Sequence, residues 1–505
     1  MKKSIITIIL LLAIVAPAQR VSAQGLERND LLYHAQSVPQ SNQLNPAFYQ
    51  KYRSAYITLP SFNISMGMPI SYSEIGFQYD QENDKYRINL YDLSEKLENN
   101  QSIHFGTNIE LFGFGFRTNK LFFNFSASAQ VDLAFYFPEG LTNILHEGLA
   151  DRIGAANAAE INASQFLHAS AYERYSIGMG YIVNDHLSIG GHFNLLNGVV
   201  NLNLEDTRIR LYATDDAYST IHGDVNYRLA RAGALNLDFE NHETEFAHSF
   251  GNTGFTFDLG ASYKTDGFTF SASLIDVGPG IHWKENIYYT EPKRTTIDFD
   301  GSNFGSLIND GQVDNEFAGN VVDTLAALLD IKDREGSDYW YGVPTKLFIG
   351  ASYDINNYIR AGLLYHGEWD RGIVTAGKGF DLGRGHFRSN LSLSANFNLA
   401  GWLELMMANA FVFDGKNGSL FNPGIGLTFS PANTVQLYVM ADFISSFYAV
   451  EAKAMNAYMG FNVRFGKNRD KKTEGNDEAA LIQIEPAQST PDPTNANGSS
   501  EPIVF

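Results

Sequence analysis

The chain has 505 residues and a net charge of −20, with 37 Phe, 26 Tyr and 45 Gly but only 18% charged residues. This composition favours a β-rich protein with one apolar face. The acidic balance argues against nucleic acid as a partner, because phosphate binding needs a concentrated basic surface. The chain contains no Cys, which excludes a disulfide framework, a zinc–thiolate site and a thiol nucleophile.

The amino terminus has the pattern of a secretory signal peptide over residues 1–23. Lys2 and Lys3 form a basic start, residues 5–16 an apolar core, and residues 21–23 a small-residue cleavage site. An apolar run of about twelve residues is too short to span a bilayer as a helix, which takes about twenty. No later segment has the length and apolar character of a membrane helix. The sequence therefore predicts an exported protein.

Residues 24–50 are polar and irregular, and they precede the first predicted strand. Ala55, Ile57 and Leu59 share one face of that strand. Pro60 breaks or bends it, because proline cannot donate a hydrogen bond to a β-ladder. Residues 61–100 mix strand and loop patterns.

The clearest pattern in the chain is an alternation over residues 120–137. Odd positions are apolar and many even positions are polar, as Phe123 and Phe125 show beside Asn124 and Ser126. Successive side chains of a strand point to opposite faces, so one face is apolar and the other polar. About ten such residues, when tilted, cross the hydrocarbon core of a bilayer. We interpret the segment as one strand of a membrane-spanning β-barrel.

Similar runs meet at six tight connections, whose Asn, Asp, Gly and Pro residues favour turns. These connections are residues 117–120, 183–186, 264–267, 354–357, 398–401 and 430–433. The runs add up to about fourteen strands, an even number of the kind that bacterial outer-membrane barrels use. The opposite connections are longer and unequal, at residues 138–169, 205–252, 278–344, 369–386, 414–419 and 445–453. The predicted fold is an all-β, antiparallel up-and-down transmembrane barrel over residues 51–466, with long extracellular loops.

A glycine followed three residues later by an aromatic residue precedes five of the six turns. Because a spacing of three places two side chains on opposite faces, we expect the aromatic rings to face lipid and the glycines to face inward. Inward glycines would leave room for a segment inside the barrel, although they could also serve only bulges or twist. The pairs are Gly113 and Phe116, Gly178 and Tyr181, Gly260 and Tyr263, Gly350 and Tyr353, and Gly426 and Phe429.

Charged residues at inward positions of the predicted strands are the candidate functional residues. They either line a conduit, where they would tune selectivity, or pair across a filled lumen and hold the strands together. The lumen-facing candidates are Asp132, Arg174, Asp258, Lys346, Arg360, Arg388, Glu404, Asp442 and Arg464.

The sequence gives no sign of catalysis or of metal binding. It contains neither a His-Glu-x-x-His nor a Gly-x-Ser-x-Gly motif. Residues 298–303 alternate oxygen-bearing side chains but lack the spacing and the terminal Glu of a calcium loop. Residues 320–331 predict a helix over a barrel mouth, and the glycine-rich run at residues 377–385 predicts an outer loop. We expect no enzyme activity, no metal and no cofactor.

Residues 467–505 differ in composition from the rest of the chain. A basic run at residues 467–472 is followed by a stretch rich in Glu, Asn, Ser, Thr and Pro with little to bury. Such a composition predicts a disordered tail on the periplasmic side.

The order of these elements resembles that of known outer-membrane proteins. A signal peptide, a polar segment with Asn45, Pro46 and Ala47, and about fourteen strands are similar to FadL-type transporters and to the related PorP/SprF-type proteins of Bacteroidota. Residues 273–278 (Ser-Leu-Ile-Asp-Val-Gly), 281–283 (Ile-His-Trp) and 344–346 (Pro-Thr-Lys) resemble an uncharacterised Bacteroidota barrel family.

These resemblances imply two different functions. The FadL resemblance implies that residues 24–50 form a plug with Asn45, Pro46 and Ala47 inside the lumen, and that small hydrophobic or amphipathic molecules pass the barrel. The PorP/SprF resemblance implies a non-transporting scaffold or accessory subunit of a secretion, gliding or surface-attachment complex. The expected partners are outer-membrane lipid, a small hydrophobic ligand, and a periplasmic or secretion-machine protein that contacts the tail.

Overall fold

The computed structural model describes residues 29–50, 53–68, 70–71, 78–80, 85–89, 102–138, 140–141, 143–144, 149, 152–162, 167–215, 220–238, 243–246, 249–300, 312–313, 331–369, 373–374, 387–413, 422–442, 444 and 453–466. Five predicted segments lie outside these residues: the signal peptide at 1–23, the helix at 320–331 except for its last residue, the glycine-rich run at 377–385, the connection at 414–419, and the tail at 467–505. In the part of the chain that is described, no helix combines the length and apolar character needed to cross a membrane.

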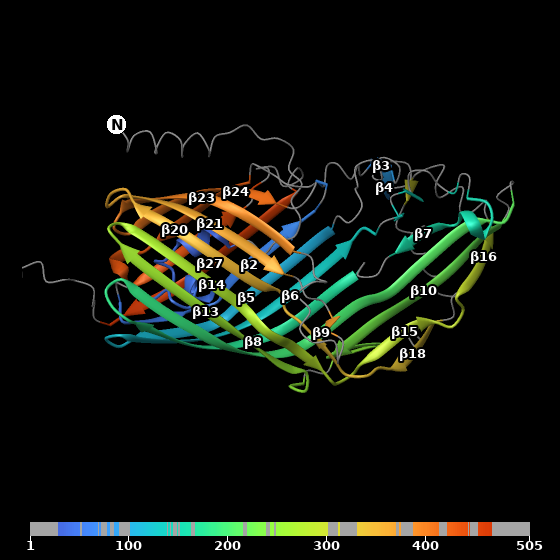
Figure 1. Ribbon diagram of the computed structural model, residues 1–505, viewed down its shortest axis with the longest axis horizontal. Helices are drawn as coiled ribbons and strands as arrows, with labels where there is room; N and C mark the ends of the chain where they lie inside the picture. The colour runs from blue at the N-terminus through green and yellow to red at the C-terminus, as the bar shows by residue number, and fades with distance from the viewer. Residues whose placement is uncertain are drawn as a thin grey trace, which may run out of the picture.

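The chain forms a closed antiparallel β-barrel, which confirms the predicted barrel fold (Figure 1). Over the described residues the barrel has 14 strands, counting β1 and β2 as one bent strand. Each strand pairs with the next along the barrel, and β27 closes the wall by pairing with β26 and with β1 and β2. The strands are β1 (Ala55–Thr58) with β2 (Ser61–Gly67), β5 (Ser102–Arg117), β6 (Leu121–Tyr136), β8 (Leu167–Ile182), β9 (Leu187–Ala213), β13 (Thr253–Thr265), β14 (Phe268–Trp283), β20 (Thr345–Asp354), β21 (Ile359–Trp369), β23 (Phe387–Ala400), β24 (Leu403–Phe413), β25 (Pro423–Phe429), β26 (Val435–Asp442) and β27 (Ala454–Phe465).

The tight connections define one end of the barrel, which we call the tight-turn end. The predicted bend at Pro60 is confirmed, because Leu59 and Pro60 separate β1 from β2. One predicted turn is displaced. A register shift between Asn398 and Ala400 extends the pairing of β23 with β24, so this turn falls at Gly401 instead of beginning at Asn398.

The wall has an apolar outer face and a polar inner face. On β13, Phe257 and Leu259 are 45% and 62% exposed, whereas Thr256 and Asp258 are 0% and 2% exposed. A water-soluble domain would show the opposite arrangement, with polar side chains at the exposed positions. Each of the other barrel strands also exposes a large apolar side chain: Ile64, Phe114, Val131, Ile177, Phe193, Phe270, Ile349, Leu363, Phe387, Phe413, Leu427, Val439 and Met459.

The glycines before the turns face the interior, as the spacing predicts. A Cβ on Gly260 would overlap Asn45, and one on Gly350 would lie 2.8 Å from the ring of Tyr33. The paired aromatic rings of Tyr263 and Phe429 are exposed on the outer face. These glycines therefore make room for chain inside the barrel.

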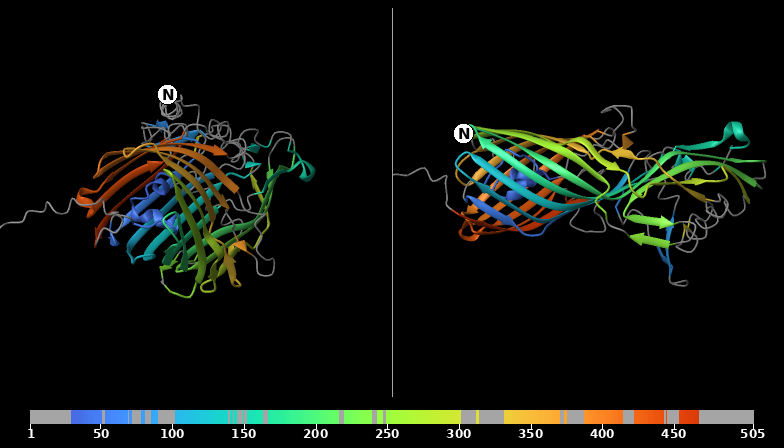
Figure 2. Two further views of the ribbon diagram at one scale, coloured as in Figure 1. Left: turned by 60° about the vertical axis from the view of Figure 1, so that its left-hand side comes forward. Right: turned by 90° about the horizontal axis from the view of Figure 1, so that it is seen from below.

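At the end opposite the tight turns, part of the wall continues as a projecting sheet (Figures 1 and 2). We call this sheet the arm. It combines residues 200–213 of β9 with β7 (Ala159–Asn162), β10 (Thr220–Gly233), β15 (Tyr288–Pro292), β16 (Thr296–Asp300) and β18 (Ile331–Glu335).

The arm corrects the expectation of loops over residues 205–252 and 278–344. A bulge between Asn226 and Arg228 shifts the register of β10 against β9, so the simple alternation that marks the barrel strands is lost there. Asp298, part of the weak calcium-like pattern, lies in β16 and contacts His222 at 2.5 Å.

Short elements complete the described chain. They are α2 (Asp30–His34), η1 (Pro39–Gln43), η2 (Ala155–Asn157), η4 (Pro431–Asn433), β3 (Gln78–Asp80), β4 (Lys85–Asn89), β11 (Leu235–Asp238), β12 (Glu243–Phe246), β17 (Gln312–Val313), β19 (Tyr339–Tyr341) and β22 (Ile373–Val374). Of these, α2 and η1 lie inside the barrel (Figure 1) and form the candidate functional site.

Candidate functional site

Residues 29–50, which we call the plug segment, fill the barrel near its tight-turn end. Leu31, Tyr33 and Val38 are at most 1% exposed. They form one apolar core with side chains of the inner wall: Ile275, Phe348, Leu364, Met406 and Met440. Each such apolar side chain gains about 1.5–3 kcal/mol from complete burial, so this core stabilises the plug segment in the lumen.

Tyr33 occupies the centre of this core. Its ring stacks on that of Phe348, with centroids 5.3 Å apart, and meets the edge of Phe48 at 5.2 Å. Its hydroxyl donates to Ser271 Oγ over 3.0 Å and accepts from Asn45 Nδ2 over 3.1 Å. One buried side chain thus joins the helix α2, the later part of the plug segment and the wall.

The motif Asn45-Pro46-Ala47 shapes the last part of the plug segment. Asn45 Oδ1 accepts the backbone N–H of Ala47 over 3.0 Å, a local turn that asparagine favours. The motif packs against the backbone of two wall glycines, because a Cβ on Gly190 would overlap Pro46 and a Cβ on Gly260 would overlap Asn45. Ser188 Oγ donates to Ala47 O over 3.0 Å. The structure therefore places the three predicted plug residues inside the lumen.

Two buried carboxylates hold the helix α2 against the wall. Asp442 of β26 accepts the backbone N–H of Leu31 over 3.2 Å and the hydroxyl of Tyr458. Asp30 of the helix accepts from Asn390 Nδ2 over 2.6 Å. Both carboxylates are at most 2% exposed, so these hydrogen bonds offset a large cost of desolvation.

Three of the predicted charged residues surround the plug segment at the tight-turn end. Glu404 accepts from Ser37 Oγ over 3.0 Å, and Arg464 Nη1 donates to Ser37 O over 3.2 Å. Arg360 pairs with Asp354 at 2.5 Å. These residues line a polar cavity of about 360 Å³ between the plug segment and the rim.

His192 joins the plug segment to a line of charges in the wall. Its Nδ1 lies 3.0 Å from Asp258 Oδ2, and its Nε2 lies 2.8 Å from Asn42 Oδ1. Asn42 Nδ2 donates to Phe48 O over 2.7 Å, which leaves Asn42 Oδ1 as an acceptor. Both ring nitrogens of His192 therefore have polar partners, one in the wall and one in the plug segment.

The line continues away from the plug segment. Asp258 Oδ1 accepts the backbone N–H of Asp276 over 2.8 Å, and the carboxylate of Asp276 pairs with Arg174. Two predicted residues, Asp258 and Arg174, thus belong to one buried network. Sequence reasoning missed His192 and Asn42, although His192 follows the same inward alternation as Asp258.

A second polar region lies in the lumen on the arm side of the plug segment. Asp132 contacts His104 Nε2 at 2.7 Å, and Arg388 pairs with Glu368 at 3.3 Å. Asp132, Glu368 and Lys346 line a cavity of about 60 Å³. Most of the charged residues predicted to face the lumen are therefore engaged with opposite charges or with the plug segment.

Comparison with solved structures gives β-barrel proteins at low identity. The toluene transporter TbuX of Ralstonia pickettii is 11% identical, covers 85% of this chain and 94% of its own, and has a TM-score of 0.39. The P. putida toluene transporter TodX is 10% identical, covers 90% and 98%, and scores 0.38. A FadL homologue of Pseudomonas aeruginosa is 9% identical, covers 85% and 94%, and scores 0.38. A search of curated proteins gave no match.

A protein-family model matches residues 46–442. The match begins at Pro46 in the plug segment and ends at Asp442, the wall carboxylate that holds the helix α2. It therefore covers most of the barrel and the arm. The chain belongs to DUF5723, a family of unknown function.

Proposed function

We propose that the protein is an outer-membrane β-barrel that passes small hydrophobic or amphipathic molecules through its lumen when the plug segment moves. In this orientation the tight turns face the periplasm and the arm projects outside the cell, as in barrels with short periplasmic turns and long external connections. The plug segment closes the lumen at rest. We expect neither catalysis nor a cofactor in this role.

The apolar outer face supports the membrane placement. Exposed side chains such as Ile177, Leu259 and Val439 lie on strands all around the barrel. A soluble monomer rarely exposes an apolar patch above a few hundred Å², whereas a lipid-facing wall needs a continuous apolar band. This apolar band therefore supports our proposal that the barrel lies in a lipid bilayer.

The apolar side chains of the inner wall beneath the plug segment support the proposal that hydrophobic molecules pass through the barrel. Phe348, Leu364, Met406 and Met440 point inward and are covered by Leu31 and its neighbours. A water-filled porin has a polar interior instead. Displacement of the plug segment would uncover an apolar surface inside the barrel, which suits an apolar solute.

An engineered disulfide tests this gating. The chain contains no Cys, and Ser188 of the wall contacts Ala47 of the plug segment, so the pair A47C/S188C is chosen to link the two by a disulfide. In intact Gram-negative cells, whose lipopolysaccharide leaflet excludes N-phenyl-1-naphthylamine, we expect the reduced variant to raise uptake of this dye at least threefold above the oxidised variant.

The unmodified chain and the single variant A47C, each measured with and without reductant, control for effects of the reductant itself. Equal uptake by empty cells, by the reduced pair and by the oxidised pair would contradict passage through the lumen.

The tight fit of the plug segment favours a second candidate, a non-transporting scaffold for a secretion, gliding or surface-attachment complex. The described residues leave cavities of only about 20 and 30 Å³ at two places between the plug segment and the wall. A scaffold role predicts that a large assembly co-purifies with the full chain and is lost without residues 467–505. The relation to PorP/SprF-type proteins and the origin in Bacteroidota stay predictions.

A further inference from the structure

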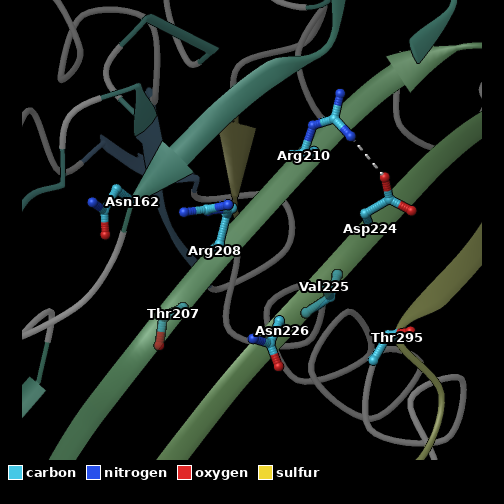
Figure 3. Close-up of a pocket in the computed structure, with 8 residues that line it drawn as sticks. All are labelled: Asn162, Thr207, Arg208, Arg210, Asp224, Val225, Asn226 and Thr295. Atoms are coloured by element: carbon cyan, nitrogen blue, oxygen red, sulfur yellow. Dashed lines mark hydrogen bonds and ion pairs between the residues drawn. The ribbon is translucent and has the colours of Figure 1, made fainter.

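A polar cavity of about 540 Å³ lies on the arm, outside the barrel (Figure 3). It opens on neighbouring residues of β7, β9 and β10, and its volume falls within the roughly 300–1,000 Å³ of small-molecule pockets. Its lining has a single aliphatic side chain, Val225, among polar ones: Asn162, Thr207, Arg208, Arg210, Asp224, Asn226 and Thr295. Such a lining suits a polar ligand.

Two arginines on the same face of β9 have different neighbours. Arg210 lies opposite Glu160 on β7 and Asp224 on β10, and contacts these carboxylates at 3.2 and 3.3 Å. Its charge is thereby balanced on both sides. Figure 3 shows the Arg210 guanidinium directed toward Asp224.

Arg208, one row nearer the barrel, has no carboxylate partner among the side chains that the structure describes. Its cross-strand neighbours are Asn162 on β7 and Asn226 on β10, whose side chains are neutral and lie within reach of it. Arg208 is exposed, and Figure 3 shows its guanidinium directed toward Asn162. Within the described part of the chain it forms no ion pair.

Three other arginines of the arm follow the balanced pattern. Arg228 and Arg334 both donate to Glu291, over 2.8 and 2.9 Å, and Arg231 pairs with Asp333. The hydrogen bonds from Arg334 hold the pKa of Glu291 at about 2, below its usual value. Arg208 differs from these three arginines in that both of its cross-strand neighbours are amides.

We propose that this cavity binds an anionic, hydroxyl-bearing ligand through Arg208. The planar guanidinium takes a carboxylate or phosphate by two parallel hydrogen bonds. Asn162 and Asn226, on either side, offer amide donors and acceptors for hydroxyl groups. An acidic or phosphorylated sugar has this chemistry, either as a free solute or as part of a lipid headgroup. The proposal is independent of passage through the lumen.

Titration of the full-length protein in detergent micelles tests the site. The probes are D-galacturonate, D-glucose 6-phosphate, neutral D-glucose and dispersed diphosphoryl lipid A, each followed by isothermal calorimetry. We expect at least one anionic probe to bind, D-glucose to bind at least tenfold more weakly, and R208Q to weaken the anionic probe at least tenfold. R208K should recover part of the loss, because an ammonium keeps the charge but lacks the planar fork.

The matched control is R334Q, which removes an arginine of the same arm that already has a carboxylate partner. It should leave binding unchanged, and gel mobility with and without heating shows that each variant retains the folded barrel. Binding of the sugar acids identifies a free solute, and binding of lipid A alone identifies a headgroup; both support the site. The proposal fails if no anionic probe binds, or if R208Q binds as tightly as the unmodified chain.

Discussion

His192 shows how a single side chain connects the barrel wall to the plug segment. It lies between the carboxylate of Asp258 and the amide oxygen of Asn42, and its side chain is 3% exposed. A buried carboxylate needs a neighbouring cation or several hydrogen-bond donors to offset the cost of its desolvation. His192 supplies one hydrogen bond to Asp258 and also contacts Asn42.

At the residue scale we predict that H192Q destabilises the folded protein by about 1–3 kcal/mol, because a glutamine amide cannot contact both Asp258 and Asn42 as the imidazole does and leaves a buried polar group without its partner. Urea unfolding in lipid vesicles measures the change. The control is H282Q, which removes a contact with Asp338, a side chain that is 63% exposed, and should cost at most about 1 kcal/mol. Equal stability of the two variants would show that His192 only fills space.

At the scale of elements, the plug segment is seated on glycine backbone. Gly190 of β9 faces the carbonyl oxygen of Pro46 so closely that a Cβ would overlap it. Main-chain atoms on both sides cannot swing away as the end of a flexible side chain can. The strand and the plug segment therefore fit each other only while residue 190 has no side chain.

We predict that G190A displaces the plug segment while the barrel remains folded. The reporter is a single introduced thiol, V38C, at a position that is 0% exposed in the seated plug segment. A maleimide reagent should label V38C at least fivefold faster with G190A. G401A is the matched control, because a Cβ at Gly401 meets nothing within 4 Å. Slow labelling in both backgrounds would contradict the seating role of Gly190.

At the scale of the whole molecule, the outer face separates a membrane barrel from a soluble one. Leu259, in the middle of β13, is 62% exposed. In water, a charged residue at so exposed a site changes stability by less than about 0.5 kcal/mol. Against lipid near the bilayer midplane, Arg costs about 2–4 kcal/mol.

We therefore predict that L259R lowers the free energy of unfolding in vesicles by about 2–4 kcal/mol. E335R, at an exposed position of the arm, is the control and should have little effect. A neutral result for L259R would remove the membrane placement and the proposed passage together.

The barrel itself could be predicted from the sequence, because apolar side chains recur at every second residue of a lipid-facing strand. This alternation does not depend on which other strands the strand pairs with. That period gave the strands, their number and the inward side of residues such as Arg174. It could not give the partners, since Arg174 pairs with Asp276, 102 residues away, and His192 contacts Asn42, 150 residues away.

The arm escaped prediction, and the plug segment was expected only from the resemblance to FadL-type transporters, because neither its burial nor its contacts leave a local pattern. The bulge near Asn226 interrupts the period on which strand prediction depends. Asn42 and Asn45 belong to residue types that favour turns, and their burial depends on hydrogen bonds from wall residues far along the chain. Long-range polar contacts leave no local pattern in a sequence.

The seam between β1 and β27 joins the first strand of the barrel to the last. Ala55 lies opposite Phe465 there, so the cylinder is sealed only when the last strand arrives. The segment enclosed by the cylinder precedes all of its strands, and its partners include Asp442 and Asn462 from the final two. The strands that close the wall are consequently also strands that hold the segment inside it.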